Sequence, residues 1–187
     1  MPEKEQKMLE ESYVKMKKHV KVAVPFALAL SLAFVCFGSM YLPIEVPQGD
    51  DLAAKLTFTL KWQILNVVPM IIGVLVVALG RDKPGMINPL LGLEDVRLKI
   101  NKQFLQNTLE QFSIATAIQL CLTAWLESHY LKVIPVLCML FLFGRICFLI
   151  CYHIGQEYRS FGFVTTWFPT LFSSFYCLYC LFSKSKV

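Results

Sequence analysis

The sequence predicts an all-α fold, a polytopic membrane helical bundle, and three observations predict it. Of the 187 residues, 56% are hydrophobic and only 17% are charged, whereas a soluble domain has about 45–50% apolar and about 25% charged residues. The mean hydropathy is +0.56. The apolar residues gather in five runs, each close to the roughly 20 residues that a helix needs to cross a bilayer. Because lipid offers the backbone no hydrogen-bonding partner, such runs have to be helices.

A charged segment, residues 1–19, precedes the first apolar run. Apolar side chains recur in it at spacings of three and four residues, which is the pattern of one helical face. They are Met8, Leu9, Tyr13, Met16 and Val20. The segment is either an amphipathic helix lying on the cytoplasmic leaflet or a solvated lead-in, and its weak amphipathicity favours the lead-in.

The basic residues of this segment stand directly ahead of the first apolar run, where the positive-inside rule places them. They are Lys15, Lys17, Lys18 and Lys21. The net charge of +5 therefore predicts a membrane orientation and no nucleic-acid partner. The connection over residues 80–103 is also basic, and the loop over residues 43–56 is acidic. We expect the N-terminus, this connection and residues 153–160 to be cytoplasmic.

The five runs divide into one extra helix and a four-helix domain. The first run begins at residue 20 and is too long for the apolar part of a signal peptide, so we interpret residues 20–56 as an anchor helix with a lumenal loop. Residues 57–182 form the four-helix domain, and residues 183–187 form a tail. The four helices of the domain over residues 57–182 are expected at about 58–79, 104–126, 131–152 and 161–182. Helix is expected to resume at about Glu94, with Asp95 in the first turn.

The seven cysteines all lie inside the apolar runs, which predicts neither a disulfide framework nor a metal site. Cys177 and Cys180 have the Cys-x-x-Cys spacing of redox and zinc sites. No second pair and no nearby histidine accompany them. We interpret them as small buried hydrophobes.

Five polar residues stand inside or beside the predicted spans, where ionisable groups are costly and mark functional sites. Asn107 and Glu110 share one face of the third span. Arg145, Tyr152 and Arg159 follow at seven-residue spacings around the end of the fourth. We expect these side chains to meet at one wet pocket open to the cytosol, with Glu110 as the partner of Arg145. Taken singly, each also has a structural interpretation: a Glu–Arg pair, an interfacial tyrosine and a positive-inside arginine.

The joint spacing, Asn-x-x-Glu in one helix and then Arg-x6-Tyr-x6-Arg around the end of the next, resembles the MAPEG superfamily. These are membrane-associated proteins in eicosanoid and glutathione metabolism. The resemblance covers about residues 57–182. The extra first span, with FGSMYLP after it and YRSFGF before the last helix, resembles the five-span, mattrin-like branch. The resemblance implies a homotrimer of MAPEG-like four-helix units that binds glutathione between subunits near the cytoplasmic face, with no other cofactor expected.

The resemblance also implies a role for each polar residue. Asn107, Glu110, Arg145 and Tyr152 match residues that bind glutathione. Arg159 matches the arginine that faces the thiol in catalytic members. A guanidinium there favours thiolate over thiol.

Three positions depart from the family pattern. Gln103 stands where an arginine often binds a carboxylate of the peptide, and Lys102 could substitute only as a point charge. Gln111 stands in place of a tyrosine or asparagine. Phe148 stands in place of a second tyrosine, so one hydroxyl is missing. These departures predict weak glutathione binding.

Two functions follow, and the sequence leaves open whether the protein is an enzyme. The first is a non-catalytic factor in secretory or endolysosomal trafficking or receptor handling, located in the endoplasmic reticulum, Golgi or lysosome, with membrane lipids and membrane proteins as partners. The alternative is a glutathione-dependent transferase or peroxidase that acts on lipid electrophiles. A channel or transporter is less favoured because no internal repeat is evident.

Overall fold

The computed structural model describes residues 3–82, 86, 94–155 and 157–184, and within these ranges the chain forms helices and no strand. The elements are α1 (Glu3–Tyr41), α2 (Leu52–Trp62), α3 (Ile64–Leu79), α4 (Val96–Trp125), the 3-10 helix η3 (Ser128–Tyr130), α5 (Val133–Ile154) and α6 (Ser160–Lys184). The predicted fold class, an all-α helical bundle with one helix added to a four-helix core, is confirmed.

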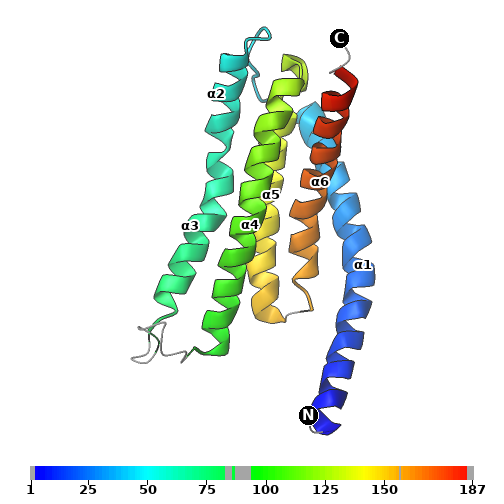
Figure 1. Ribbon diagram of the computed structural model, residues 1–187, viewed down its shortest axis with the longest axis vertical. Helices are drawn as coiled ribbons and strands as arrows, with labels where there is room; N and C mark the ends of the chain where they lie inside the picture. Colours follow the sequence, from blue (N-terminus) through cyan, green and yellow to red (C-terminus); the bar gives the residue numbers. More distant parts are fainter. Residues whose placement is uncertain (1–2, 83–85, 87–93, 156, 185–187) are drawn as a thin grey trace.

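The helices lie side by side as long rods (Figure 1). α2 and α3 form one rod that is interrupted at Gln63. α1 packs against α6 and α5, on the flank of the bundle away from α2 and α3. The start of α1, the end of α3, the start of α4 and the α5–α6 connection lie at one end, which we call the Arg159 end (Figure 1). The opposite end, with the starts of α2 and α5, is called the Lys55 end.

Among the described residues, three stretches are both long and apolar enough to cross a membrane: Tyr13–Tyr41, Leu52–Leu79 and Ser128–Ile154. α4 and α6 run alongside them (Figure 1). The buried face of α4 carries, among apolar side chains, five polar ones: Asn101, Thr108, Gln111, Gln119 and Thr123. All of these except Thr108 make interhelical hydrogen bonds, which hold membrane helices together. Gln119 Oε1, for example, accepts from Gln63 Nε2 at 2.7 Å and from Asn66 Nδ2 at 3.0 Å.

Two aspartates fix where helices begin. Asp51 accepts hydrogen bonds from the backbone N–H groups of Ala53 and Ala54 at 3.3 and 3.1 Å, so α2 begins at Leu52, earlier than the expected residue 58. Asp95 accepts from the N–H of Leu98 at 2.8 Å. It is therefore the N-cap of α4 rather than the first-turn residue that we expected.

The charged lead-in and the first span form one uninterrupted helix, α1. The apolar side chains of Met8 and Leu9 lie outside the described residues. The structure shows no break at residue 20, and the domain boundaries stay a prediction. Because α1 is continuous, its charged half is held at a fixed angle to the half that packs against the core.

α5 and α6 cross in very close contact. A Cβ added to Gly162 would lie 2.4 Å from the backbone N of Phe148 and 2.6 Å from the carbonyl oxygen of Gly144. Only glycine allows two backbones to approach so closely. The crossing places Arg145, which follows Gly144, directly against α6.

Candidate functional site

Arg145 is completely buried where α4, α5 and α6 meet. Its Nη1 donates to Asn107 Oδ1 at 2.9 Å, and its Nη2 donates to Thr166 Oγ1 at 2.8 Å and to the Gly162 carbonyl at 3.3 Å. Its guanidinium also lies 4.7 Å from the centre of the Phe148 ring. All these partners are neutral, so the charge is solvated by dipoles and a ring face rather than paired with a carboxylate.

The hydrogen bonds continue beyond Arg145 into α4. Thr166 Oγ1 accepts from Arg145 and donates to Gln111 Oε1. Gln111, predicted only as a departure from the family pattern, is therefore a buried acceptor. No hydrogen-bond partner is found for its Nε2 or for Arg145 Nε among the described residues.

Arg159 and Tyr152 form a second contact, at the Arg159 end. Arg159 Nη1 donates to the Tyr152 hydroxyl at 3.1 Å, and the guanidinium lies 5.2 Å from the centre of the Tyr152 ring. The two residues were expected to converge, and the contact is made across the end of α5 at Ile154 rather than along one helical face. Within the described part of the chain, no carboxylate lies close enough to Arg159 to form an ion pair.

A cleft of about 340 Å³ lies beside this pair. Its lining comes from α1, α4, α5, the α5–α6 connection and the start of α6. It comprises Met16, Val20, Gln103, Asn107, Phe148, Glu157, Arg159, Ser160 and Phe163. Asn107 joins the cleft to the buried Arg145, and Arg159 lines it directly. Of the predicted residues, Asn107 and Arg159 line the cleft, Arg145 is bonded to Asn107 behind it, and Tyr152 is bonded to Arg159.

Glu110 does not join them, and the prediction that it pairs with Arg145 is wrong. It is exposed on the outer face of α4, where its Oε1 accepts from Gln106 Nε2 at 2.9 Å. Residues three apart on a helix differ by about 60° in direction. The boundary between the inner and outer faces of α4 falls between Asn107 and Glu110.

Lys102 is also placed away from the cleft. Its Nζ forms an ion pair with Glu94, just before the start of α4. Gln103, rather than Lys102, lines the cleft. The position where the family often has a carboxylate-binding arginine is therefore occupied by the neutral amide of Gln103.

Several residues of the site were not singled out as site residues, among them Glu157, Ser160 and Phe163 of the cleft lining. Met16 and Val20 of α1 line the cleft, and Thr166 of α6 holds Arg145. The spacing of Met16 and Val20 indicated a helical face but not what that face would contact. No spacing rule links Thr166 to Arg145, because the two lie on different helices.

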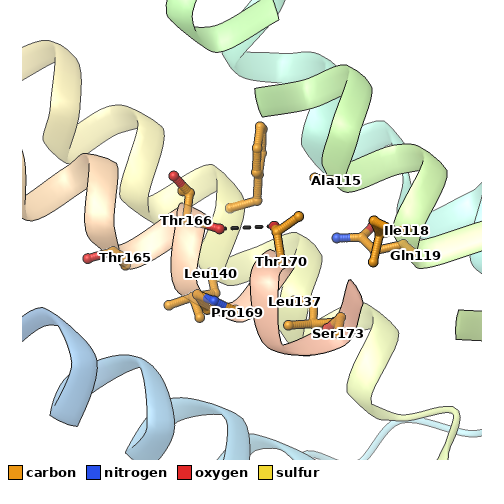
Figure 2. A pocket seen from close by; sticks show the side chains of 11 residues that line it. Ala115, Ile118, Gln119, Leu137, Leu140, Thr165, Thr166, Pro169, Thr170 and Ser173 are labelled. Carbon is orange, nitrogen blue, oxygen red and sulfur yellow. Dashed lines mark hydrogen bonds between the residues drawn. The ribbon is translucent and has the colours of Figure 1, made fainter. Parts of the chain in front are cut away.

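Two other cavities do not have the chemistry of a polar ligand site. A void of about 10 Å³ beside Gln119, Thr166 and Thr170 is too small for a peptide or a lipid (Figure 2). A groove of about 410 Å³ between α1, α5 and α6 is almost entirely apolar, apart from Ser31 and Ser173. The Arg159 cleft is the cavity that combines a charged group, amides and an apolar wall.

Comparison with known proteins gives one family match and two curated relatives. The model described as MAPEG family matches residues 60–179. The chain is 25% identical over 163 residues to Transmembrane protein 79 of Mus musculus, covering 86% of this chain and 41% of that protein. It is 24% identical over 142 residues to Transmembrane protein 79 of Bos taurus, covering 76% and 36%. The chain thus spans about two fifths of the length of the curated relatives it matches. No solved structure matches.

Proposed function

Because the chain belongs to the MAPEG family, we propose that it is a multi-pass endomembrane protein that acts without catalysis, as a factor in secretory or endolysosomal trafficking or in receptor handling. The similarity to Transmembrane protein 79 agrees with the resemblance of this chain to the mattrin-like branch. That resemblance motivates the proposed trafficking role. The observation that carries the proposal is the position of α1. This extra helix packs on the core and supplies Met16 and Val20 to the cleft that the resemblance assigns to glutathione.

The residues of the cleft fit glutathione only in part. Lys102 is paired with Glu94, Glu110 faces away, and Phe148 has no hydroxyl to donate. Gln103, Asn107 and Arg159 are left to orient a zwitterionic tripeptide. Glutathione has two carboxylates, and the cleft has few positively charged groups to bind them. This favours the non-catalytic function.

Photo-crosslinking in cells tests this proposal. A photoreactive amino acid at Val22 or Leu32, both strongly exposed on α1, is expected to capture a specific membrane protein in endoplasmic reticulum, Golgi or lysosomal fractions. The matched control is the buried Ala27 on the same helix, which should capture nothing in trans. The proposal is wrong if both exposed sites capture no partner while the purified protein consumes thiol with a lipid electrophile.

An epitope at the N-terminus that is accessible after selective plasma-membrane permeabilisation would support the cytoplasmic orientation.

A homotrimer is part of the proposal, and Glu110 supports an assembly. Glu110 is an exposed ionisable residue near the midpoint of α4. Such a residue is costly where it faces lipid, so a protein surface is expected to cover it. Native mass spectrometry in mild detergent should detect three copies of the chain. A monomer over a range of mild detergents contradicts this expectation.

A second function, glutathione-dependent transfer or peroxide reduction, is favoured by one observation. Arg159 lines the cleft, is oriented by Tyr152, and has no carboxylate partner among the described residues. Such a cation stabilises a thiolate. Adding glutathione to purified protein should then produce thiolate absorbance in the ultraviolet that Arg159→Ala abolishes and Arg97→Ala, on the exposed side of α4, leaves unchanged. A flat signal in the wild type excludes this function.

A further inference from the structure

The cleft at the Arg159 end is more strongly cationic than its lining alone suggests. Arg159 contributes one guanidinium, and Arg145 lies one residue behind the wall, bonded to Asn107. Within the described ranges neither forms an ion pair with a carboxylate. Arg145 is completely buried, and the field of a buried charge is weakly screened. The two charges therefore add in the cleft, where Glu157 is the one carboxylate of the lining.

Arg145 also decides which way the Asn107 amide points. A guanidinium only donates hydrogen bonds, so the atom of Asn107 that faces it must be the carbonyl oxygen. The Nδ2 group then lies on the other side of the amide, and Asn107 is part of the cleft lining. The Asn107 Nδ2 group is thus a neutral hydrogen-bond donor in the cleft lining, which also contains the Arg159 guanidinium. Donors from an amide and a planar guanidinium match the oxygens of a phosphate group.

Apart from Gln103 and Ser160, the rest of the lining is apolar and belongs to the membrane part of the bundle. Met16 and Val20 come from α1, Phe148 from α5 and Phe163 from α6. Met16 and Val20 lie within the stretch Tyr13–Tyr41, which is apolar enough to cross a bilayer. Four lysines lie on the same turns of α1, at Lys15, Lys17, Lys18 and Lys21. Basic residues at the start of a membrane helix attract anionic lipids.

From these features we propose that the cleft binds the phosphate headgroup of an anionic phospholipid from the leaflet at the Arg159 end. Arg159 and Asn107 Nδ2 donate to the phosphate, Arg145 orients Asn107, and the start of an acyl chain lies against Met16, Val20, Phe148 and Phe163. α1 is thereby a wall of the lipid site as well as an anchor. The inference rests on the proposed membrane function and names the class of ligand that the same cleft takes.

The test uses the purified full chain in detergent micelles and a fluorescent phosphatidic acid, with binding followed by fluorescence anisotropy. Unlabelled phosphatidic acid should displace the probe, whereas phosphatidylcholine, inorganic phosphate and glutathione should not at the same concentration. Displacement by inorganic phosphate shows that the site takes a free anion, and displacement by glutathione shows that it is a peptide site. Either result overturns the inference.

Four variants separate the cleft from general attraction to a basic surface. Arg159→Gln should weaken binding about tenfold or more, because it removes a charge-assisted hydrogen bond. Glu157→Gln should tighten binding about two- to fivefold, because it removes a like charge. Met16→Trp should weaken binding by filling the cleft without changing its charge. Arg97→Gln is the matched control, since it removes one positive charge at the same end from an exposed residue outside the cleft.

Equal binding by the wild type, Arg159→Gln and Met16→Trp overturns the inference, as does an equal loss in Arg97→Gln and Arg159→Gln. Circular dichroism identifies a variant that fails to fold. Met16→Trp and Glu157→Gln alter the cleft without touching the Arg145 hydrogen bonds, so the inference remains testable if Arg159→Gln is unstable. Lipid binding by the pure protein is independent of capturing a cellular partner, so the two proposals fail separately.

Discussion

Arg145 is the residue on which the interior of the bundle is organised. It is fully buried, and its two terminal nitrogens reach a side-chain amide on α4, a hydroxyl on α6 and a backbone carbonyl on α6. The planar fork of arginine can address three acceptors in different directions, whereas a lysine ammonium is a compact point charge. The residue therefore joins three helices through one rigid group. Its role differs from that of a salt bridge, since its partners are neutral.

Arg145→Lys should destabilise the protein by about 1–3 kcal/mol, because at least one buried acceptor, on Asn107 or Thr166, is left without its donor. The measurement is thermal unfolding in detergent, followed by circular dichroism. Arg97→Lys is the control and should change the free energy of unfolding by less than about 0.5 kcal/mol, since Arg97 is exposed. Equal unfolding temperatures for Arg145→Lys and the wild type would contradict the assigned role.

At the scale of elements, the crossing of α5 and α6 sets the position of the site. Gly162 meets backbone atoms of α5, and Gly144 meets a methyl group of Thr166. Backbone atoms cannot turn aside as a side chain can, so the approach at Gly162 tolerates no Cβ. The Gly162 carbonyl is also an acceptor for Arg145. Separating the two helices would thus disturb both the packing and the buried charge.

Gly162→Ala should therefore destabilise the bundle by several kcal/mol, in the upper range of single substitutions. Gly73→Ala is the matched control: its added Cβ would lie 2.9 Å from the Cδ1 of Leu105, the end of a flexible side chain. We expect Gly73→Ala to lose much less stability than Gly162→Ala, because Leu105 can change rotamer. Thermal unfolding of both variants in the same detergent decides, and a smaller loss for Gly162→Ala than for Gly73→Ala would refute the close crossing.

The connections at the Lys55 end are fastened by Asp50. Its carboxylate accepts from the Ser128 backbone N–H at 3.2 Å and lies 3.6 Å from Lys55 Nζ. The hydrogen bond from the Ser128 backbone, with the charge of Lys55 as a smaller cause, lowers the pKa of Asp50 below its ordinary value of 3.8. This joins the loop before α2 to η3.

A lowered carboxylate pKa gives a definite sign to the pH dependence. The contribution of Asp50 to stability is complete above pH 3.8 and is lost as the pH falls through the lowered folded-state pKa. Asp50→Asn should therefore lower the unfolding temperature slightly at neutral pH, and the difference from the wild type should vanish in acid. A difference that persists at a pH well below the lowered folded-state pKa, or that grows as the pH falls, contradicts this role. Asp51→Asn is a useful comparison, because asparagine also caps helices well.

At the scale of the whole molecule, the helices could be predicted from the sequence and their contacts only in part. Hydropathy predicts the long helices, because a segment in lipid needs apolar side chains and a backbone whose N–H and C=O groups are all hydrogen-bonded. Four-residue spacing placed Met16 and Val20 on one face of α1, and both line the cleft, because residues four apart on a helix lie on nearly the same face. Both rules act within one helix, where the geometry of the chain is fixed.

Contacts between helices depend on how each rod is rotated, and that is decided by packing. Glu110 was misassigned because the rotation of α4 puts Asn107 inside and Glu110 outside. The polar inner face of α4 also reduces its hydropathy, so composition alone does not reveal that it is central. The position of α1 was the least predictable feature, because its contacts are mostly aromatic and apolar and have no characteristic spacing.

The packing of α1 on its own core is the feature on which both proposals depend, and it can be tested directly. The rings of His19 on α1 and Tyr158 before α6 lie 4.6 Å apart. In a Cys36→Ser, Cys121→Ser background, which removes the two exposed cysteines, the pair His19→Cys and Tyr158→Cys should be joined by a short bismaleimide. The product should migrate as a single chain with altered mobility, since both residues belong to one molecule. Each single variant is the control and should give no such product. If the double variant instead yields linked dimers or trimers, α1 packs on a neighbouring copy, and the wall of the Arg159 cleft is supplied in trans.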